Sequence, residues 1–419
     1  MAAVLAPFHV RSFRFQWPAD LFTSWAIEME NLILGWFVLS TTGSVEKLVV
    51  FGALVWFGSL FSPLFGVLGD RLGFRLLLCA TRAGYALLAL ALTALTFAGA
   101  LVPWQVFTIA AVAGLLRPQD NVMRYVLVGQ TMRPELLMPA LGIQRTTSDT
   151  ARIAGALAGT GGVALIGMGP AYVIVTGMYV AAFLLSLGVA GPPRRAGRES
   201  AEAAAARALA GLRQALGYVW GRPDQLGAFS VAFLVNLLAF PFFLGLLPYV
   251  AKDVYAVGQS GLGYLAASFA CGAFAGSLVL GAGRAPWRAG RAMLAAAALW
   301  FVAILAFGQS RAMSVGLALL FACGVAQSFC MTPLAAVMLR SASDEMRGRV
   351  MGIRMLAIWG LPLGLLAAGP LIARLGYPAA TALYAGSGLA ATLAIAWRWR
   401  AALWDRAAPA NSPFAGERP

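Results

Sequence analysis

Between two long apolar runs, the sequence reads Gly66-Val-Leu-Gly69-Asp70-Arg71-Leu-Gly73-Phe-Arg75. Glycine has no Cβ, so it lets two helices approach closely and lets the chain turn sharply. The carboxylate and the guanidinium groups are too costly to leave unpaired in hydrocarbon. This stretch therefore predicts a tight, charged hairpin that joins two helices at a membrane surface.

The composition of the whole chain supports a membrane setting. Of 419 residues, 60% are hydrophobic and 11% are charged, and the mean hydropathy is +0.79. Soluble domains average about 45–50% and 25% for these two classes, and they could not enclose so much apolar surface. At roughly 20 apolar residues per span, the chain has room for about twelve spans. We predict an all-α polytopic membrane protein and exclude a soluble, disordered or coiled-coil chain.

Apolar runs bounded by Arg, Gly and Pro mark the expected spans. The first six cover 21–41, 47–69, 75–99, 104–129, 138–168 and 171–190, and the second six cover 226–250, 259–283, 290–308, 312–338, 350–373 and 377–397. This pattern predicts an N-terminal six-helix bundle (1–190), a cytoplasmic linker (191–225), and a C-terminal six-helix bundle with a short tail (226–419), the two bundles enclosing a central cavity. In the linker, apolar residues at helical spacing predict an amphipathic helix on the membrane surface: Leu209, Leu212, Leu216 and Val219.

Basic residues set the expected orientation. Only four of the 31 Lys and Arg residues fall in loops on one side, namely Lys47, Lys252, Arg311 and Arg374, and most of the others lie on the opposite side. Loops rich in Lys and Arg stay in the cytoplasm. We therefore expect both termini in the cytoplasm and the chain in the cytoplasmic (inner) membrane. This asymmetry accounts for much of the net charge of +15, so no nucleic-acid partner is expected.

Six spans followed by six, with the charged hairpin between the second and third, resemble the Major Facilitator Superfamily of transporters. The family signature there is Gly-x-x-x-Asp-Arg-x-Gly-x-Arg, and this chain matches it with Gly66, Asp70, Arg71, Gly73 and Arg75. The resemblance implies a secondary transporter in which this gating motif, with Gly69, holds the cytoplasmic side closed in the outward-facing state. It also implies that Asp120 of the fourth span pairs with Arg75.

Further stretches are similar to the enterobactin-exporter-like and macrolide-efflux-like branch of that family. They are Arg347-Gly348-Arg349-Val350, Gly360-Leu-Pro362-Leu-Gly364 and Gly272-Ala-Phe-Ala-Gly276. Exporters often carry Gly-Pro-x-x-Gly-Gly in span five, whereas this chain has Gly155-Ala156-Leu-Ala-Gly159-Thr160. This departure leaves import open as an alternative to export. We expect the small residues of span five to pack close to Gly272 and Gly276 of span eight.

Charged side chains are concentrated in the expected spans of the first half: Glu28, Glu30, Arg117, Asp120, Arg124, Arg145, Asp149 and Arg152. Each costs roughly 2.5–3.5 kcal/mol at mid-bilayer, so they must pair, reach the interface or line a wet cavity. One interpretation is an ion-pair lattice near the cytoplasmic ends. The other places Arg117 and Arg152 in the cavity as substrate or relay groups, together with Asn31 and, in the second half, Asn236 and Gln327.

Two glutamates of the first span are the candidates for proton coupling. Glu28 and Glu30 lie about 200° apart around a helix, so they cannot share a face. Glu28 belongs to a polar or small row with Ser24, Asn31 and Gly35, whereas the row of Glu30 is otherwise apolar. We expect Glu28 to face the cavity and bind protons, and Glu30 to be buried; the converse assignment and a purely structural pairing with Arg117 or Arg152 are the alternatives.

The function expected from these features is transport. We predict a proton-coupled exporter of small, drug-like or siderophore-like organic molecules, with an importer of an organic solute as the alternative. The partners are then a small-molecule substrate, protons and the lipid bilayer, and a monomer suffices. The single His9 and four scattered cysteines have no metal-ligand spacing, and no ATP-binding loop occurs. We therefore expect no enzyme activity, metal or cofactor.

Overall fold

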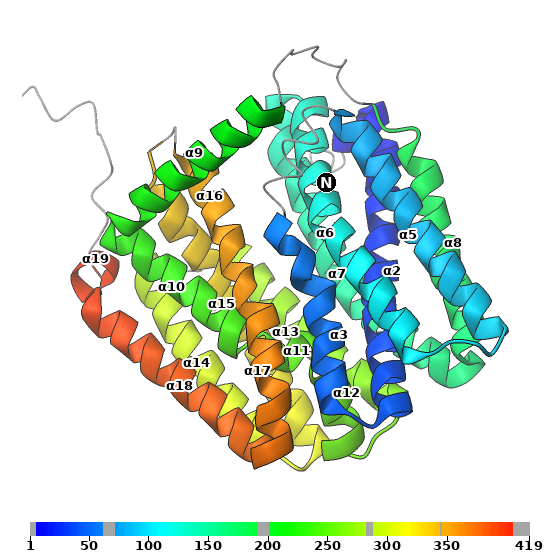
Figure 1. The fold of residues 1–419 in the computed structure, drawn as a ribbon. Helices are drawn as coiled ribbons and strands as arrows, with labels where there is room; N and C mark the ends of the chain where they lie inside the picture. The colour runs from blue at the N-terminus through cyan, green and yellow to red at the C-terminus, as the bar shows by residue number, and fades with distance from the viewer. Residues whose placement is uncertain (1–5, 62–71, 191–200, 282–287, 344–345, 405–419) are drawn as a thin grey trace, which may run out of the picture.

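The structure is a computed structural model that describes residues 6–61, 72–190, 201–281, 288–343 and 346–404. This part of the chain is built from helices and contains no strand (Figure 1). It forms two six-helix bundles joined by a separate linker helix, so the predicted all-α architecture with twelve spans is confirmed.

The first bundle consists of six spanning segments in chain order. They are α2 (Arg11–Thr42), α3 (Val45–Phe57) with the 3-10 turn η2 (Gly58–Phe61), α5 (Phe74–Phe97), α6 (Pro103–Thr131), α7 (Pro134–Ile166) and α8 (Met168–Ser186). A short turn η1 (Ala6–His9) precedes them.

The second bundle repeats this count. Its segments are α10 (Pro223–Leu238) with α11 (Pro241–Leu244) and α12 (Leu247–Tyr249), α13 (Gln259–Gly281), α14 (Ala289–Gln309), α15 (Met313–Arg340), α16 (Arg347–Leu356) continued through η4 (Ala357–Trp359) into α17 (Gly360–Leu375), and α18 (Tyr377–Arg398). The π turn η3 (Val250–Val254) follows α12, and α19 (Arg400–Trp404) follows α18.

Seven helical stretches in the described ranges are long and apolar enough to cross a membrane on their own. Five of them lie in the C-terminal half and only α5 and α8 in the N-terminal half. The long helices α2, α6 and α7 fall outside this set and are the ones that carry the clustered charges. Polar chemistry is thus concentrated in the first bundle.

The first helix differs from its predicted bounds. α2 begins at Arg11, ten residues before the expected start at 21. The extension is helical because a polar row (Ser12, Gln16, Asp20 and Thr23) repeats every three to four residues and is buried against the bundle. It brings Asp20 inside the protein, although the sequence placed this residue outside the span.

Each bundle has its own hydrophobic core, and α3 contributes to both. Phe51 and Val55 pack in the N-terminal core, whereas Val49 and Ala53 pack in the C-terminal core. α3 lies against α17, and α7 lies against α13. These pairs converge at the end of the molecule opposite α9 (Ala201–Trp220), as Figure 1 shows. The bundles therefore meet most closely at that opposite end.

Close contacts between the bundles confirm where they meet. Lys252 Nζ donates a hydrogen bond to the carbonyl oxygen of Leu39 over 3.3 Å, next to the turn that links α2 and α3. A Cβ added at Gly369 of α17 would lie 2.6 Å from Cγ2 of Val49 in α3. Glycine is needed there because a Cβ would collide with the Val49 side chain and crowd Cα of Glu46, 3.2 Å away.

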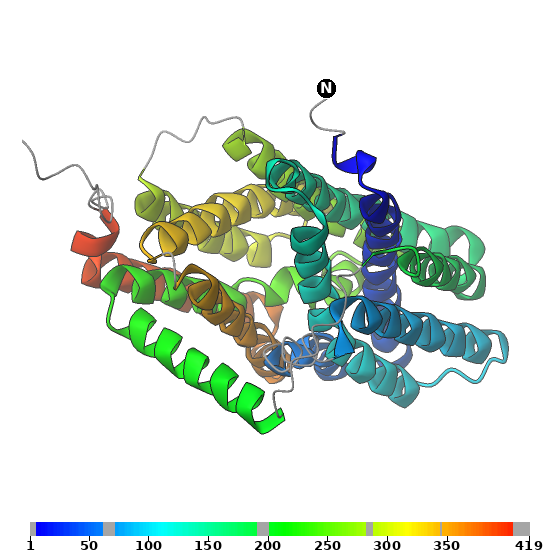
Figure 2. The ribbon, with the colours of Figure 1, turned by 90° about the horizontal axis from the view of Figure 1, so that it is seen from above.

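The linker helix α9 lies along the outer edge of the C-terminal half, beside α16 and α10 (Figure 2). Ala215 and Val219 are buried in the C-terminal core, and Leu216 packs against it. Arg349 of α16 donates a hydrogen bond to Oε1 of Gln214. The apolar face of α9 therefore covers the second bundle, whereas the side chains of Leu209 and Leu212 lie outside the described residues.

Candidate functional site

Arg82 of α5 occupies the middle of the first bundle and is only 1% exposed. Its Nε donates to Oδ1 of Asp120 over 3.2 Å, one terminal nitrogen donates to Oγ of Ser186 over 2.7 Å, and the other pairs with Asp20. A buried guanidinium is stable only when its nitrogens are hydrogen-bonded and its charge is balanced. Here three other helices (α2, α6 and α8) supply the groups that do both.

A second arginine completes a neutral group of four ions, the Asp–Arg cluster of Asp20, Arg82, Asp120 and Arg124. Arg124 lies 2.5 Å from Oδ2 of Asp120, four residues earlier on α6, and its Nε lies 3.5 Å from Asp20. The amide of Gln144 on α7 donates to the free oxygen of Asp20 over 3.0 Å. The Asp–Arg cluster, Gln144 and Ser186 of α8 thus connect five of the six segments of the first bundle.

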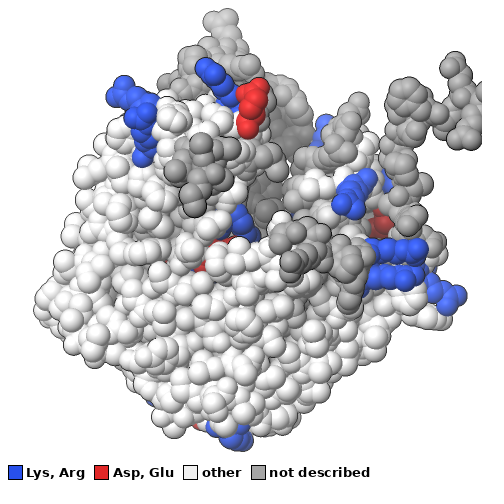
Figure 3. All heavy atoms as spheres, turned by 180° about the vertical axis from the view of Figure 1, so that it is seen from behind, with Lys and Arg blue, Asp and Glu red and all other residues white. Residues whose placement is uncertain are grey.

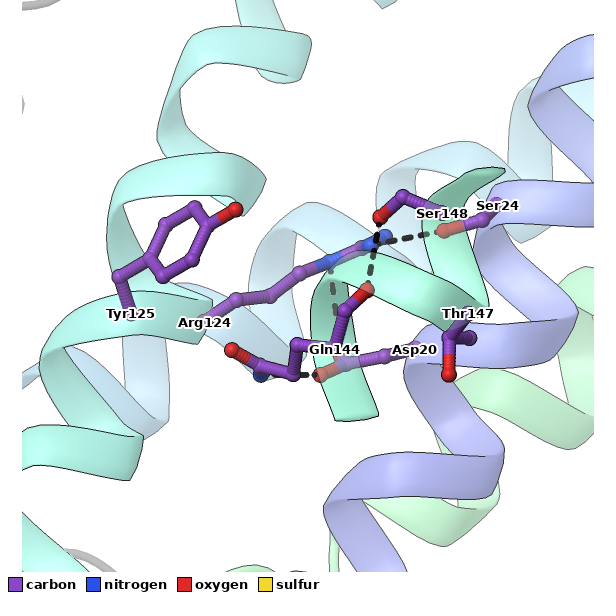
Figure 4. A pocket seen from close by; sticks show the side chains of 7 residues that line it. All are labelled: Asp20, Ser24, Arg124, Tyr125, Gln144, Thr147 and Ser148. Atoms are coloured by element: carbon purple, nitrogen blue, oxygen red, sulfur yellow. Dashed lines mark hydrogen bonds and ion pairs between the residues drawn. The ribbon is translucent and has the colours of Figure 1, made fainter. Parts of the chain in front are cut away.

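The exposed edge of this cluster borders a pocket with about 280 Å³ of empty space, part of it open to solvent. Figure 4 shows Arg124 and Tyr125 on α6, facing Asp20 and Ser24 on α2 and a row on α7 that consists of Gln144, Thr147 and Ser148. Arg124 donates to Oγ of Ser24 over 2.8 Å, and Oε1 of the buried Gln144 has no hydrogen-bond partner among the described atoms. This wall combines charged groups, hydroxyl groups and an unused acceptor.

The predicted pairing of Asp120 with Arg75 is wrong. Arg75 is exposed and donates to the carbonyl oxygen of Leu187 over 2.7 Å. Arg82 lies seven residues further along α5, two helical turns deeper on the same face, and takes the position beside Asp120. Sequence reasoning missed Arg82 because it counted this residue among the cytoplasmic charges, and it missed Asp20 because the first span was drawn too short.

The two glutamates of α2 have different surroundings. The carboxylate of Glu28 lies 3.8 Å from Nε of Arg152 on α7, and about a third of each side chain is exposed. Glu30 is 7% exposed and accepts a hydrogen bond of 2.8 Å from the hydroxyl of Tyr179 on α8. The two carboxylates lie on different faces of α2, as their angular separation predicts. One reaches solvent and the other is enclosed.

Arg117 pairs with a neutral group rather than a carboxylate. It donates to Oδ1 of Asn31 over 3.0 Å, and its guanidinium lies 5.2 Å from the centre of the Trp56 ring. On α7, Nε of Arg145 lies 3.1 Å from its i+4 neighbour Asp149, while the arginine side chain remains 59% exposed. On α7, Arg152 therefore pairs with α2, whereas Arg145 and Asp149 pair with each other.

The two candidates in the second bundle take no part in these contacts. Asn236 is buried and donates to the carbonyl oxygen of Ala232 on its own helix over 2.8 Å. Gln327 is buried on α15, and its Oε1 has no partner among the described atoms. Of the gating motif, Gly66, Gly69, Asp70 and Arg71 lie outside the described residues. Gly73 caps α5 with a φ of +91°, which favours glycine.

The expected contact between the glycine rows of spans five and eight is wrong in detail. A Cβ at Gly155 or Gly159 of α7 would meet α2, at Glu28 and Met29 respectively. Gly272 and Gly276 of α13 instead face α15. α7 and α13 do pack together, but through Gly263, which lies against Ala156 and Thr160.

Comparisons with known proteins agree with this architecture. Residues 21–362 match the family described as the Major Facilitator Superfamily. No curated protein sequence matches the chain.

Three similar solved structures have low sequence identity. The POT family transporter PepTSo has a TM-score of 0.73 at 13% identity, with 94% of this chain and 98% of that chain covered. A bacterial homologue of the human lysosomal transporter Spinster, inward-facing and unoccupied, has 0.67 at 14%, covering 94% and 96%. The human organic anion transporter MFSD10 has 0.64 at 16%, covering 92% and 99%. At these identities the similarity shows the fold.

Proposed function

Because the chain belongs to the Major Facilitator Superfamily, we propose that it is a proton-coupled secondary active transporter that exports small organic molecules by alternating access. The observation that carries the proposal is the solvent-accessible ion pair of Glu28 and Arg152 between α2 and α7. A transporter that couples solute movement to protons needs an acid that reaches water and exchanges partners when it is protonated. Glu28 is partly exposed, and its pair with Arg152 supplies the partner that protonation would release.

The arrangement of the bundles supports an inward-facing state. Contacts between them concentrate at the end opposite α9. Figure 3 shows a hollow between the two halves towards the α9 end, with basic and acidic side chains inside it. The excess of arginine in the loops at the α9 end favours the cytoplasm for that end. The hollow then opens to the cytoplasm, where an exporter takes up its substrate.

The Asp–Arg cluster has a structural part in this proposal. Its ion pairs among the described residues all connect helices within the first bundle. Alternating access moves the two bundles as nearly rigid units around the site. A neutral cluster of ion pairs keeps the first unit rigid, while the glycine contacts of α3 with α17 form the surface that opens.

Import of an organic solute is the second candidate. The same ion pair favours import if a proton and an anionic solute bind at the same time. Protonation of Glu28 leaves the positive charge of Arg152 unbalanced, which attracts an anion into the cavity. A proton and an anionic solute would then bind together and move in the same direction. If the proton and the solute exclude each other, they move in opposite directions and the protein exports.

The test is transport by the purified full chain in liposomes loaded with the pH dye pyranine. Ethidium, erythromycin and 1-naphthoate serve as cationic, macrolide and anionic probes. The proposal expects at least one probe to start a proton flux that empty liposomes lack, and the direction of that flux relative to the solute separates export from import. Solute movement without proton flux rules out the coupling, and no movement of any probe contradicts the transport of such molecules.

A further inference from the structure

The C-terminal end of α18 carries a group of exposed basic and aromatic side chains. α18 ends at Arg398, the short helix α19 follows it, and α14 packs against both. We call this group the α19 corner, and its members are Arg288, Arg291, Trp397, Arg398, Arg400 and Trp404. Figure 3 shows basic side chains gathered at this edge of the second half, away from the hollow between the bundles. The transport proposal assigns no role to them.

Contacts with Trp404 hold two of these arginines in place. Nη1 of Arg288 donates to the carbonyl oxygen of Trp404 over 2.7 Å, and the guanidinium of Arg291 lies 5.2 Å from the centre of the Trp404 ring. Gly290 lies against the backbone of Leu403, where any side chain would collide with it. The start of α14 is therefore fixed against α19, and arginines from two distant stretches of the sequence share one corner of the molecule.

The α19 corner is positively charged, because acids do not balance its four arginines. Among the described residues, no ion pair involves any of them. α10 also packs against α19, but its one acid, Asp224, pairs with Arg222 over 3.6 Å. The adjoining stretches 282–287 and 405–419 lie outside the described residues, and their charged side chains are three basic and two acidic ones: Arg284, Asp405, Arg406, Glu417 and Arg418. Counting these side chains therefore leaves the group positive.

The neighbouring surface of α18 places this charge at the level of the lipid headgroups. α18 is long and apolar enough to cross a membrane, so its end at Arg398 lies near the membrane surface. Leu393 is 58% exposed, and Trp397, one turn later on the same face, is 74% exposed. An apolar face that ends in tryptophan is typical of a helix end at the interface between hydrocarbon and headgroups. The arginines beyond it keep their charged ends in the headgroup layer.

We propose that the α19 corner binds the phosphate group of an anionic phospholipid in the leaflet at the α9 end. α10 packs against both α9 and α19, so these two helices share that end of the molecule. Basic clusters that directly follow a membrane-spanning helix attract anionic lipids. A guanidinium presents two parallel N–H donors, which match two oxygens of a phosphate. Arg288 uses one of its five donors on Trp404, and the others remain for the lipid.

The lipid site is independent of the transport proposal. The pocket and the Asp–Arg cluster belong to the first bundle, whereas the α19 corner lies on the outer edge of the second. A phosphate that pairs with Arg291 of α14 and Arg400 of α19 bridges two helices of the second bundle. Binding to the folded chain alone then raises its melting temperature.

The test compares lipids with the same acyl chains whose headgroups differ in charge. The purified full chain in a nonionic detergent is titrated with dioleoylphosphatidylglycerol, dioleoylphosphatidylserine or dioleoylphosphatidylcholine, and native mass spectrometry resolves the first bound lipid. We expect at least one of the two anionic lipids to bind about tenfold more tightly than the zwitterionic phosphatidylcholine. If phosphatidylcholine binds as tightly as both anionic lipids, the proposal is overturned.

Substitutions then locate the headgroup. Arg291→Gln combined with Arg400→Gln is expected to weaken binding of the preferred anionic lipid by about tenfold or more, because two charges next to the phosphate are lost. Lysine at both positions keeps the charges and is expected to retain most of the affinity. Arg213→Gln combined with Arg340→Gln is the matched control, because these two arginines are exposed at the same end but outside the α19 corner.

The two double variants change the net charge equally, so their comparison separates a site from overall attraction. An equal loss of affinity in both shows that the lipid responds to total charge and overturns the proposal. Unchanged affinity in the variant of Arg291 and Arg400 overturns it as well. Melting curves without added lipid identify any loss of folding, in which case Arg400→Gln alone replaces the double variant, with an expected loss of about fivefold.

Discussion

Nε of Arg82 lies 3.2 Å from Oδ1 of Asp120, and both side chains are almost completely enclosed. The two residues come from neighbouring helices, α5 and α6, and each also bonds to a second ion of opposite charge. In this arrangement no ion of the Asp–Arg cluster can be removed without leaving a charge in a nonpolar interior. Leaving a buried charge unpaired costs more free energy than the complete ion pair contributes to stability.

Replacing Arg82 with glutamine is therefore expected to destabilise the first bundle strongly. Asp20 and Asp120 would then share the single positive charge of Arg124. Removal of one partner from a buried ion pair costs about 3–5 kcal/mol. The measurement is the free energy of unfolding in mixed micelles, together with the melting temperature.

Two further variants make this prediction specific. Arg82→Gln combined with Asp120→Asn restores a balance of one carboxylate and one guanidinium, so it should recover a large part of the loss. Arg75→Gln removes an exposed hydrogen bond to Leu187 and should cost less than about 1 kcal/mol. A double variant less stable than Arg82→Gln would show that charge balance is not the cause.

The helices and their grouping could be predicted because hydrocarbon imposes a simple pattern. Every span must be an apolar run of sufficient length, and such runs are visible in the sequence. The start of α2 could not be found this way because Arg11, Arg14 and Asp20 lower its apolarity. The signal in the sequence was the helical spacing of four polar residues, Ser12, Gln16, Asp20 and Thr23. The structure buries all four.

The candidate site was predictable only in part. The sequence predicts that charges gather in the first bundle, because the spans of the second half contain few ionisable residues. Which ions pair depends on the depth at which helices distant in the sequence face one another. Arg82, rather than Arg75, reaches the level of Asp120.

A larger side chain at Gly369 is expected to separate the bundles at the end opposite α9. A Cβ there would lie 2.6 Å from Val49 Cγ2 and 3.2 Å from Cα of Glu46, so Gly369→Val wedges α17 away from α3. Spin labels at Lys47 and Arg374, both exposed near that end, should report a population with longer distances. Gly386→Val is the control because its Cβ meets nothing within 4 Å; an equal shift there would refute a local wedge.

Asp70→Asn is expected to lower transport strongly without impairing membrane insertion. Asp70 lies outside the described residues, so this prediction follows from the gating motif, in which the carboxylate pairs with arginines at the membrane surface. The initial rate of solute exchange at matched protein density is the readout. Asp224→Asn removes an acid that forms an exposed surface pair with Arg222 and should leave the rate unchanged. A normal rate for Asp70→Asn contradicts the gating assignment.

The last prediction separates the two glutamates of α2. Glu28 is partly exposed beside Arg152, whereas Glu30 is enclosed and bonded to Tyr179. A coupling group must exchange protons with water in both states of the transporter. On accessibility we therefore expect the proton to bind at Glu28, and the converse expectation requires a separate water path to Glu30.

Glu28→Gln should abolish solute accumulation driven by a pH gradient while exchange down a solute gradient continues. Glutamine has no ionisable proton, so Glu28→Gln should not respond to an imposed proton gradient, whereas the unmodified chain should. Glu30→Gln keeps an acceptor for Tyr179 and should retain gradient-driven accumulation. Both variants are measured in proteoliposomes at matched protein density. Full accumulation by Glu28→Gln contradicts the assignment, and its loss in Glu30→Gln alone transfers the coupling to the enclosed glutamate.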